Sequence, residues 1–105
     1  MAKITNKHKM DGTLEDALRG ADVFIGLSTA NIVTSKMVET MNGDTIVYAL
    51  TNLIPEIMPE AAFLGGARIV VNGRPDFPNQ INNVIDYPGI FRGALMIRAK
   101  LLLII

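Results

Sequence analysis

Amide side chains are concentrated in one short stretch of this sequence. Asn79, Gln80, Asn82 and Asn83 fall within five residues, which is too many for a simple turn. Each amide carries two N–H donors and a carbonyl acceptor, which can pair with a hydroxy acid or a nicotinamide. We expect Asn79 and Gln80 to hold the loop to itself, and Asn82 or Asn83 to face a cleft. The stretch therefore predicts a ligand-binding loop.

The charged residues and the single histidine have simpler interpretations. Arg74 and Asp76 are close neighbours, and a local ion pair is the commonest fate of such residues. Glu56 and Glu60 are four apart, so we place them on one face of a solvated helix start. His8 lies in a polar N-terminal segment, where we expect a solvated surface residue. No cysteine occurs and no metal-ligand spacing surrounds His8, so the sequence predicts neither a disulfide nor a metal site.

Three short apolar segments are expected to form the strands that position this loop. They are Asp22 to Leu27, Thr45 to Leu50, and Ala67 to Val71. Each segment is nearly continuous in apolar character, which is typical of strands covered by helices on both faces. The sequence therefore predicts three buried strands.

Helical signals alternate with these strands. Thr13 stands three residues before Asp16, which predicts a capped helix that ends at Gly20. Thr34 repeats this capping pattern at residues 34–41. The other helices are expected to begin after Pro55 and end at Gly65-Gly66, and to run from about Gly89 onward. Alternating strands and helices pair in parallel through right-handed crossovers. The predicted fold class is α/β, a partial Rossmann-like fold of about three parallel strands with flanking helices. Because three strands leave two open edges, we expect the unit to be part of a larger sheet.

The carboxyl ends of these strands are the expected binding positions, because ligands of open parallel sheets bind there. Small or amide residues follow each predicted strand, namely Ser28-Thr29, Thr51-Asn52 and Asn72-Gly73. Their side chains can hydrogen-bond a ribose, a phosphate or a carboxamide. The same residue types are ordinary turn formers, so position alone leaves both interpretations open.

Composition excludes several classes of function. The 105 residues carry ten basic and ten acidic side chains and only 6% aromatics, with no basic run, so no nucleic-acid partner is expected. The longest apolar run, Leu101 to Ile105, is far shorter than the roughly 20 residues of a membrane span. The N-terminal residues lack the apolar core of a secretory signal. We therefore expect a soluble, cytoplasmic protein.

Longer motifs carry a family resemblance over nearly the whole chain. They are TLEDALRGADVFIG at 13–26, YALTN at 48–52, PEIMPE at 55–60, DFPNQINNV at 76–84 and PGIFRGAL at 88–95. Together they resemble the bacterial type of malic enzyme. The last two motifs are the most specific, because that order of amides followed by PGIFRGAL is found in few other proteins.

This resemblance implies oxidative decarboxylation of malate to pyruvate and carbon dioxide, with NAD or NADP and a divalent Mg or Mn. It implies that Asn52 and Asn83 contact the substrate and the nicotinamide end of the cofactor. Asn82 stays a candidate binding residue from its place in the amide-rich loop. It also implies that Ser28 and Thr29 line the dinucleotide cleft. Residues 1–105 would be the C-terminal half of the NAD(P)-binding domain, a fragment of the enzyme.

The chain also departs from the family pattern. Leu53 stands where the family has proline after the asparagine, Pro75 stands where it has serine, and Met96 stands where an acidic residue is common. The Gly-rich phosphate motif, the metal ligands and the catalytic Tyr and Lys of the family are not in this sequence. We therefore expect no catalytic residue and no metal ligand here, and no turnover of malate by this chain alone.

Two other interpretations remain open at the level of sequence. The chain can serve as an interaction module that pairs with a separately encoded N-terminal part of the enzyme, or with a second copy of itself. An exposed sheet edge and an apolar helix face favour such association. A small unrelated doubly wound domain, such as a signalling receiver, is disfavoured because no acidic cluster follows the strands.

Overall fold

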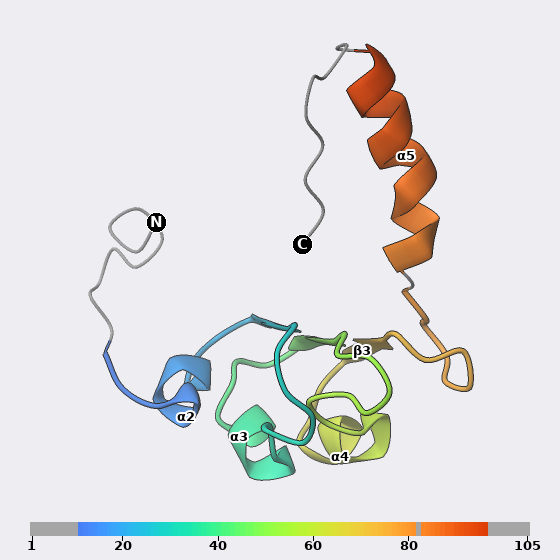
Figure 1. Cartoon of the computed structure of the whole chain (residues 1–105). Coiled ribbons are helices and arrows are strands. Elements are labelled where there is room, and N and C mark those ends of the chain that lie inside the picture. Colours follow the sequence, from blue (N-terminus) through green and yellow to red (C-terminus); the bar gives the residue numbers. More distant parts are fainter. Residues whose placement is uncertain (1–10, 82, 97–105) are drawn as a thin grey trace.

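A computed structural model describes residues 11–81 and 83–96 of the chain (Figure 1). Its elements are, in order, α2 (Leu14–Leu18), β1 (Val23–Gly26), α3 (Ser35–Glu39), β2 (Ile46–Ala49), α4 (Pro59–Leu64), β3 (Ile69–Asn72) and α5 (Asn83–Met96). The three strands form one sheet in the order β1-β2-β3, and both pairings are parallel. The predicted α/β, partial Rossmann-like fold is confirmed.

The first two helices begin where their caps were predicted. The Thr13 side chain accepts a hydrogen bond from the Asp16 backbone N–H, and the Asp16 carboxylate accepts from the Thr13 backbone N–H at 3.0 Å. This reciprocal pair satisfies two of the donors that a helix start leaves without intrahelical partners. Thr34 caps α3 through a single bond, in which its hydroxyl accepts from the Met37 N–H at 3.3 Å.

The predicted start of the third helix was wrong. We expected the helix after Pro55, but α4 begins at Pro59, whose missing N–H suits the first helical position. Residues 55–58 instead form a loop that pairs with the segment after β1. Asn31 N–H donates to Pro55 O, and Val33 N–H donates to Glu56 O, each at 3.0 Å.

The predicted start of the last helix was also wrong. It was expected at about Gly89, after Pro88, but α5 begins at Asn83 and contains Pro88 in its interior. Proline costs a helix the one backbone hydrogen bond that its own nitrogen would donate. The turns on either side of Pro88 keep helical geometry. Proline therefore did not mark the boundary of this helix.

Residues of the three strands line up in rows across the sheet. The row of Phe24, Val47 and Val70 points toward the helices and is buried in the main core. The next row on that side, at the carboxyl ends of the strands, consists of Gly26, Ala49 and Asn72. Its members are small or polar, so space remains beneath the strand ends for a side chain from another segment.

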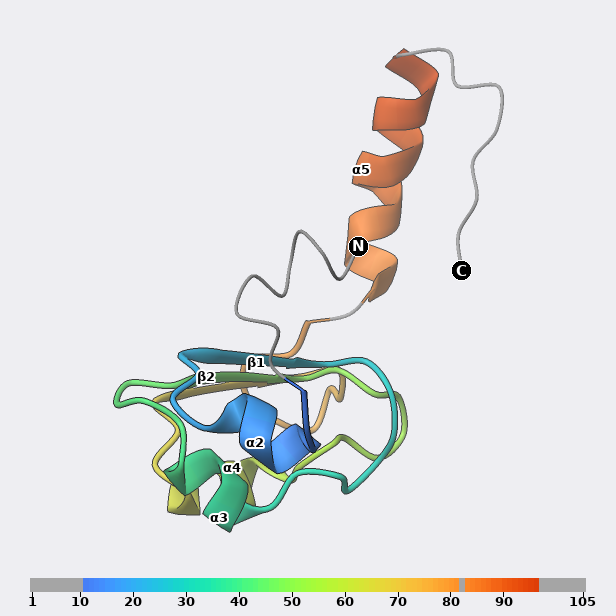
Figure 2. The same cartoon turned by 90° about the vertical axis from the view of Figure 1, so that its left-hand side faces the viewer.

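Helices α2, α3 and α4 all cover one face of the sheet (Figures 1 and 2). The other face is exposed at β1, with Ile25 62% exposed and Leu27 73% exposed, whereas Val71 of β3 on the same face is only 6% exposed. Coverage of the strands on both faces was expected and is not found in the described part of the chain. Helix α5 extends away from the sheet in both views. No helix within residues 11–81 and 83–96 is long and apolar enough to span a bilayer.

Candidate functional site

The carboxyl ends of the three strands bring the predicted binding residues to one edge of the sheet. Ser28 and Thr29 follow β1, Asn52 follows β2 and Gly73 follows β3. The side chains of Ser28, Thr29 and Asn52 are exposed, as a ligand-binding role requires. The parallel topology therefore assembles groups that lie far apart in the sequence.

A buried carboxylate, Glu56, ties two of these strand ends together. Its side chain is fully buried. One oxygen, Oε1, accepts from the Ser28 N–H at 3.1 Å and from the Thr51 hydroxyl, and Oε2 accepts from the Thr51 N–H at 3.2 Å. Glu56 was predicted to lie on a solvated helix face with Glu60, and that prediction was wrong because residue 56 precedes the helix. The signal that could have placed it is Pro59, which marks the helix start.

The hydrogen bonds of Glu56 also decide its ionisation. Burial raises the pKa of the Glu56 carboxyl, but the bonds from the Thr51 hydroxyl and from the backbone N–H groups of Glu56, Thr51 and Ser28 together outweigh it. The pKa of Glu56 is consequently held below its ordinary value. The carboxylate is therefore charged at neutral pH and acts as an acceptor of hydrogen bonds, not as a proton donor.

Asn52 projects from a turn with unusual backbone geometry. The residue that follows it, Leu53, has φ of 72°. A leucine in this left-handed region costs roughly 1–2 kcal/mol. Its side chain is 85% exposed, so packing of the side chain does not hold the turn. Contacts of the main chain must therefore hold it.

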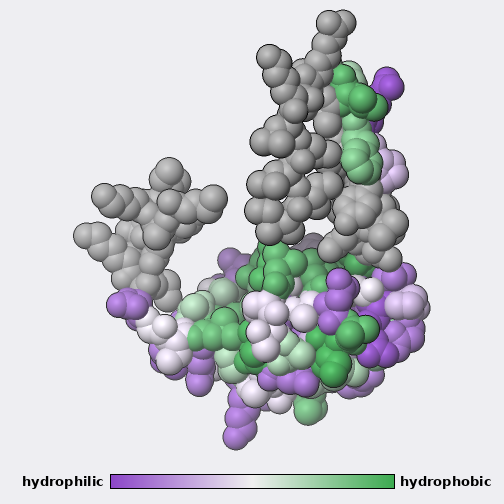
Figure 3. Space-filling view, in the orientation of Figure 1, coloured by the Kyte–Doolittle hydropathy of each residue, from purple (hydrophilic) through white to green (hydrophobic). Residues whose placement is uncertain are grey.

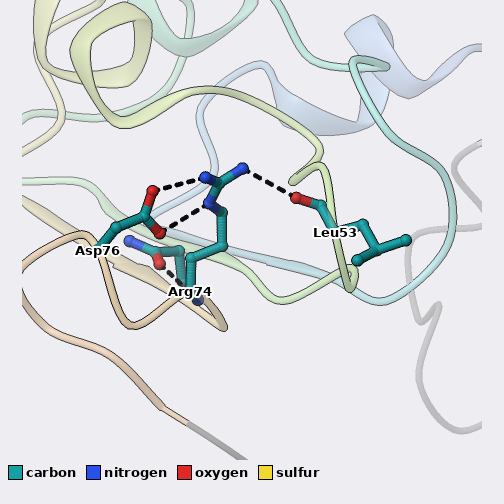
Figure 4. Close-up of polar contacts among 4 residues, drawn as sticks. Leu53, Arg74 and Asp76 are labelled. Atoms are coloured by element: carbon teal, nitrogen blue, oxygen red, sulfur yellow. Dashed lines mark hydrogen bonds and ion pairs between the residues drawn. The ribbon is translucent and has the colours of Figure 1, made fainter.

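One such contact comes from Arg74, in the loop after β3 (Figure 4). Its Nη1 donates to the Leu53 carbonyl at 3.1 Å, while Nε and Nη2 bind the two oxygens of Asp76 at 2.8 and 2.5 Å. The predicted local pair of Arg74 and Asp76 is confirmed. Their mutual hydrogen bonds raise the pKa of Arg74 and lower the pKa of Asp76.

The turn and the loop together frame a depression of about 470 Å³ on the surface. It is lined by Asn52, Leu53, Gly73, Arg74, Pro75 and Asp76. Gly73 forms a floor at which several groups meet. A Cβ placed on Gly73 would lie 3.5 Å from Asn52 Oδ1 and 3.8 Å from the Ile81 carbonyl oxygen. The Asn52 amide therefore lies near the segment that leads to Asn83.

The loop after β3 is tied to that strand by one side chain and by its backbone. Asn79 Nδ2 donates to the Val70 carbonyl at 3.2 Å, so this amide binds β3 and does not hold the loop to itself as expected. The backbone of Gln80 forms a parallel bridge with Asn72, and the expected role of the Gln80 side chain stays a prediction. Asn72 is buried, and its Oδ1 accepts from the Arg74 N–H at 2.8 Å. Its Nδ2 has no hydrogen-bond partner among the described residues.

Comparison with known proteins decides the relationship. No family model matches the chain. The chain is 54% identical over 94% of its length to the bifunctional malic/malolactic enzyme of Bacillus subtilis, and 50% identical over 94% to the NAD-dependent malic enzyme of Geobacillus stearothermophilus. The crystal structure of the NAD-dependent malic enzyme from Thermotoga maritima superposes on 90% of the chain, with a TM-score of 0.83 and 48% identity. The chain is homologous to one part of the malic enzymes.

That part is small. The chain spans 24% of the Bacillus subtilis malic enzyme and 20% of the Geobacillus stearothermophilus one, and it covers 25% of the Thermotoga maritima structure. NADP-dependent malic enzymes match as well, among them that of Rhizobium meliloti at 49% identity over 84% of the chain. Both classes of dinucleotide are therefore represented among the relatives.

The turn at Asn52 is not compatible with proline at residue 53. The sequence resemblance implies proline at this position, and the proline ring restricts φ to about −65°. Leu53 has φ of 72°, which that ring does not allow.

Several predicted site residues remain predictions. Asn83 is the first residue of α5, but its side chain lies outside what is described, and so do all of Asn82 and His8. The convergence of Asn52 and Asn83 is thus supported only by the position of Ile81. Residues 11–81 and 83–96 contain no group of three or more carboxylate, histidine or cysteine side chains that could hold a metal ion.

Proposed function

We propose that this chain forms part of the substrate and nicotinamide cleft of a malic enzyme, corresponding to the C-terminal half of its NAD(P)-binding domain. The reaction is the oxidative decarboxylation of malate to pyruvate with reduction of NAD or NADP. The observation that carries the proposal is that the Asn52 amide and the Ile81 carbonyl both lie close to Gly73, 3.5 and 3.8 Å from where its Cβ would stand, and that Ile81 directly precedes Asn82 and Asn83 in the sequence. In this role Asn52 and Asn83 bind substrate and nicotinamide, and Asn82, Ser28 and Thr29 support them.

The described residues fit a dinucleotide better than they fit a metal. An exposed amide beside a glycine floor suits the carboxamide of a nicotinamide, which supplies the hydride acceptor when bound. The Mg or Mn of the reaction has no cluster of ligands among the described residues. Its ligands, and the catalytic acid and base, must then come from another part of the enzyme. Such an enzyme acts in the cytoplasm.

A chimera tests this proposal. The segment of the Bacillus subtilis malic enzyme that matches this chain is replaced by residues 1–96, and malate-dependent reduction of the dinucleotide is measured. We expect the chimera to be active, whereas the purified 105-residue chain gives no turnover with malate, NAD and Mn. Asn52→Ala in the chimera should lower kcat by roughly 100-fold, because an orienting hydrogen bond to the reacting groups is lost.

Asn42→Ala is the matched control. The Asn42 amide binds Asp22 at 2.8 Å, before the first residues of β1 and β2 and therefore at the opposite end of the sheet. Its loss should leave kcat within about twofold, since it touches no reacting group. Equal effects of the two substitutions, or turnover by the isolated chain, would contradict the proposed function.

The exposed apolar residues on the face of the sheet opposite to α2, α3 and α4 favour a second candidate function, an interaction module that restores activity in trans. Val23, Ile25, Leu27 and Ile69 are all exposed there. Figure 3 shows further hydrophobic residues exposed on the compact part and along α5. Parallel sheets are almost always covered on both faces, so this surface is suited to apolar helices of a complementary N-terminal part.

Charge on this face should block such association. We expect Ile25→Lys to abolish complementation when the chain is mixed with a malic enzyme lacking the matching segment, because a lysine would be buried in an apolar interface. Leu64→Lys is the control, since Leu64 is 78% exposed on α4, on the opposite side of the sheet. Sedimentation shows whether the wild-type chain pairs with the complement or with itself. If the wild-type chain stays monomeric in the presence of its complement, this function is excluded.

A further inference from the structure

Asn52 is held from both sides by charged side chains of other segments. On its N-terminal side, Thr51 donates its N–H and hydroxyl to the buried Glu56 carboxylate. On its C-terminal side, the Leu53 carbonyl accepts from Arg74 Nη1 at 3.1 Å. The two contacts come from the loop before α4 and from the loop after β3, so they fix the turn against two different parts of the fold.

Arg74 is itself oriented before it reaches Leu53. Asp76 binds Nε and Nη2 of the guanidinium in a two-pronged pair, and the Phe77 ring centroid lies 5.3 Å from Cζ. A planar guanidinium held at two nitrogens has little freedom left at the third. Figure 4 shows the remaining nitrogen aimed at the Leu53 carbonyl.

The turn requires an external constraint of this kind. Leu53 adopts a left-handed φ that leucine rarely takes, and its exposed side chain makes no core contact that would hold it there. A surface ion pair would ordinarily matter little for the fold. Here Arg74 also donates a third hydrogen bond, to the carbonyl of Leu53 beyond the end of β2. The ion pair therefore helps to hold the turn at residue 53.

We propose that Arg74 and Asp76 are positioning residues for Asn52: they set the direction of its amide by fixing the Leu53 carbonyl. The consequence for catalysis rests on the proposed function, in which Asn52 contacts substrate and nicotinamide. The positioning itself is a property of the free chain and is measurable without any ligand.

Nuclear magnetic resonance relaxation on the 105-residue chain tests the positioning. In Arg74→Gln, we expect the order parameters of the backbone N–H groups of Asn52 and Leu53 to fall from about 0.85 to below about 0.6. The order parameters of the backbone N–H groups in β2 should stay unchanged. Arg74→Lys should give an intermediate loss, because lysine keeps the charge but cannot bind Asp76 and Leu53 together. Asp76→Asn should loosen the same two amides.

Arg68→Gln is the matched control, since Arg68 forms an exposed pair with Asp44 at 3.0 Å. Both residues precede strands, β3 and β2, and so lie at the end of the sheet opposite to Asn52. It should leave residues 51–54 unchanged. Unaltered order at Asn52 and Leu53 in Arg74→Gln would overturn the positioning role.

Activity in the chimera separates this inference from the proposed function. There, Arg74→Gln should lower kcat by roughly tenfold with a smaller change in KM, because the amide is misdirected in the transition state. If Asn52 loses order while kcat is unaffected, the positioning role stands and the proposed contact of Asn52 with the reacting groups is wrong. If order is retained, the positioning role is wrong whatever kcat does.

Discussion

Replacement of Glu56 by alanine is expected to lower the free energy of unfolding by about 3–5 kcal/mol. The substitution leaves the Ser28 N–H, the Thr51 N–H and the Thr51 hydroxyl without their acceptor, and it opens a cavity at a fully buried position. Urea denaturation followed by circular dichroism measures the change. Small domains have only about 5–15 kcal/mol in total, so this variant is expected to be at the limit of folding.

Glu56→Gln keeps the shape of the side chain and makes the prediction independent of whether the alanine variant folds. One amide oxygen can still accept, but the NH₂ group must face a donor, which should cost about 1–3 kcal/mol. A change of less than about 0.5 kcal/mol in Glu56→Gln, within the usual range of a surface substitution, would show that the carboxylate does not hold the strand ends.

The pH dependence of stability follows from the same contacts. Because the folded-state pKa of Glu56 lies below its ordinary value of 4.5, its contribution is fully present above that value and is lost as the pH falls through the folded pKa. We therefore expect the stability difference between wild type and Glu56→Gln to shrink on acidification below about pH 4.5. The pKa values of Asp16 and Asp76 are lowered as well. Wild type and Glu56→Gln should therefore both lose some stability in acid through these two carboxyl groups.

The parts of the fold that could be predicted from the sequence depend on neighbours in the chain. The Thr13 cap needs only Asp16, three residues away, and the Thr34 cap needs only Met37. The strands were predicted correctly because each one is a short, nearly continuous apolar run that follows a helical segment. Arg74 and Asp76 were correctly paired because they are two residues apart.

The parts that could not be predicted depend on contacts between distant segments. Glu56 binds Ser28, 28 residues earlier, and its spacing from Glu60 imitates a helix face. Nothing in the sequence indicates the left-handed φ of Leu53, because leucine is not a residue typical of that region. The relation of Asn52 to Asn83 stays a prediction for the same reason, since it depends on where the loop after β3 delivers the helix that begins at residue 83.

Gly26→Ala should destabilise the chain by about 2–4 kcal/mol, since it displaces the Glu56 carboxyl. A Cβ at residue 26 would lie 2.6 Å from Oε1 of Glu56, closer than any ordinary contact. The end of a flexible side chain usually moves aside at little cost, but this carboxyl is fully buried and holds hydrogen bonds to two strand ends. Moving it therefore breaks those bonds. Urea denaturation measures the effect, and Gly43→Ala is the control, because no heavy atom lies within 4 Å of a Cβ there.

A double-mutant cycle identifies the cause of this loss. If the methyl group acts by displacing the carboxyl, Gly26→Ala should cost less than about 1 kcal/mol in the Glu56→Ala background, because the group that it would displace is absent. In the Glu56→Gln background, where the shape of the side chain is kept, most of the wild-type cost should remain. The coupling should be larger with alanine, whose missing side chain leaves room for the methyl group. Additive losses in both backgrounds would mean that Gly26 is required for some other reason, and the carboxylate would not be what keeps residue 26 small.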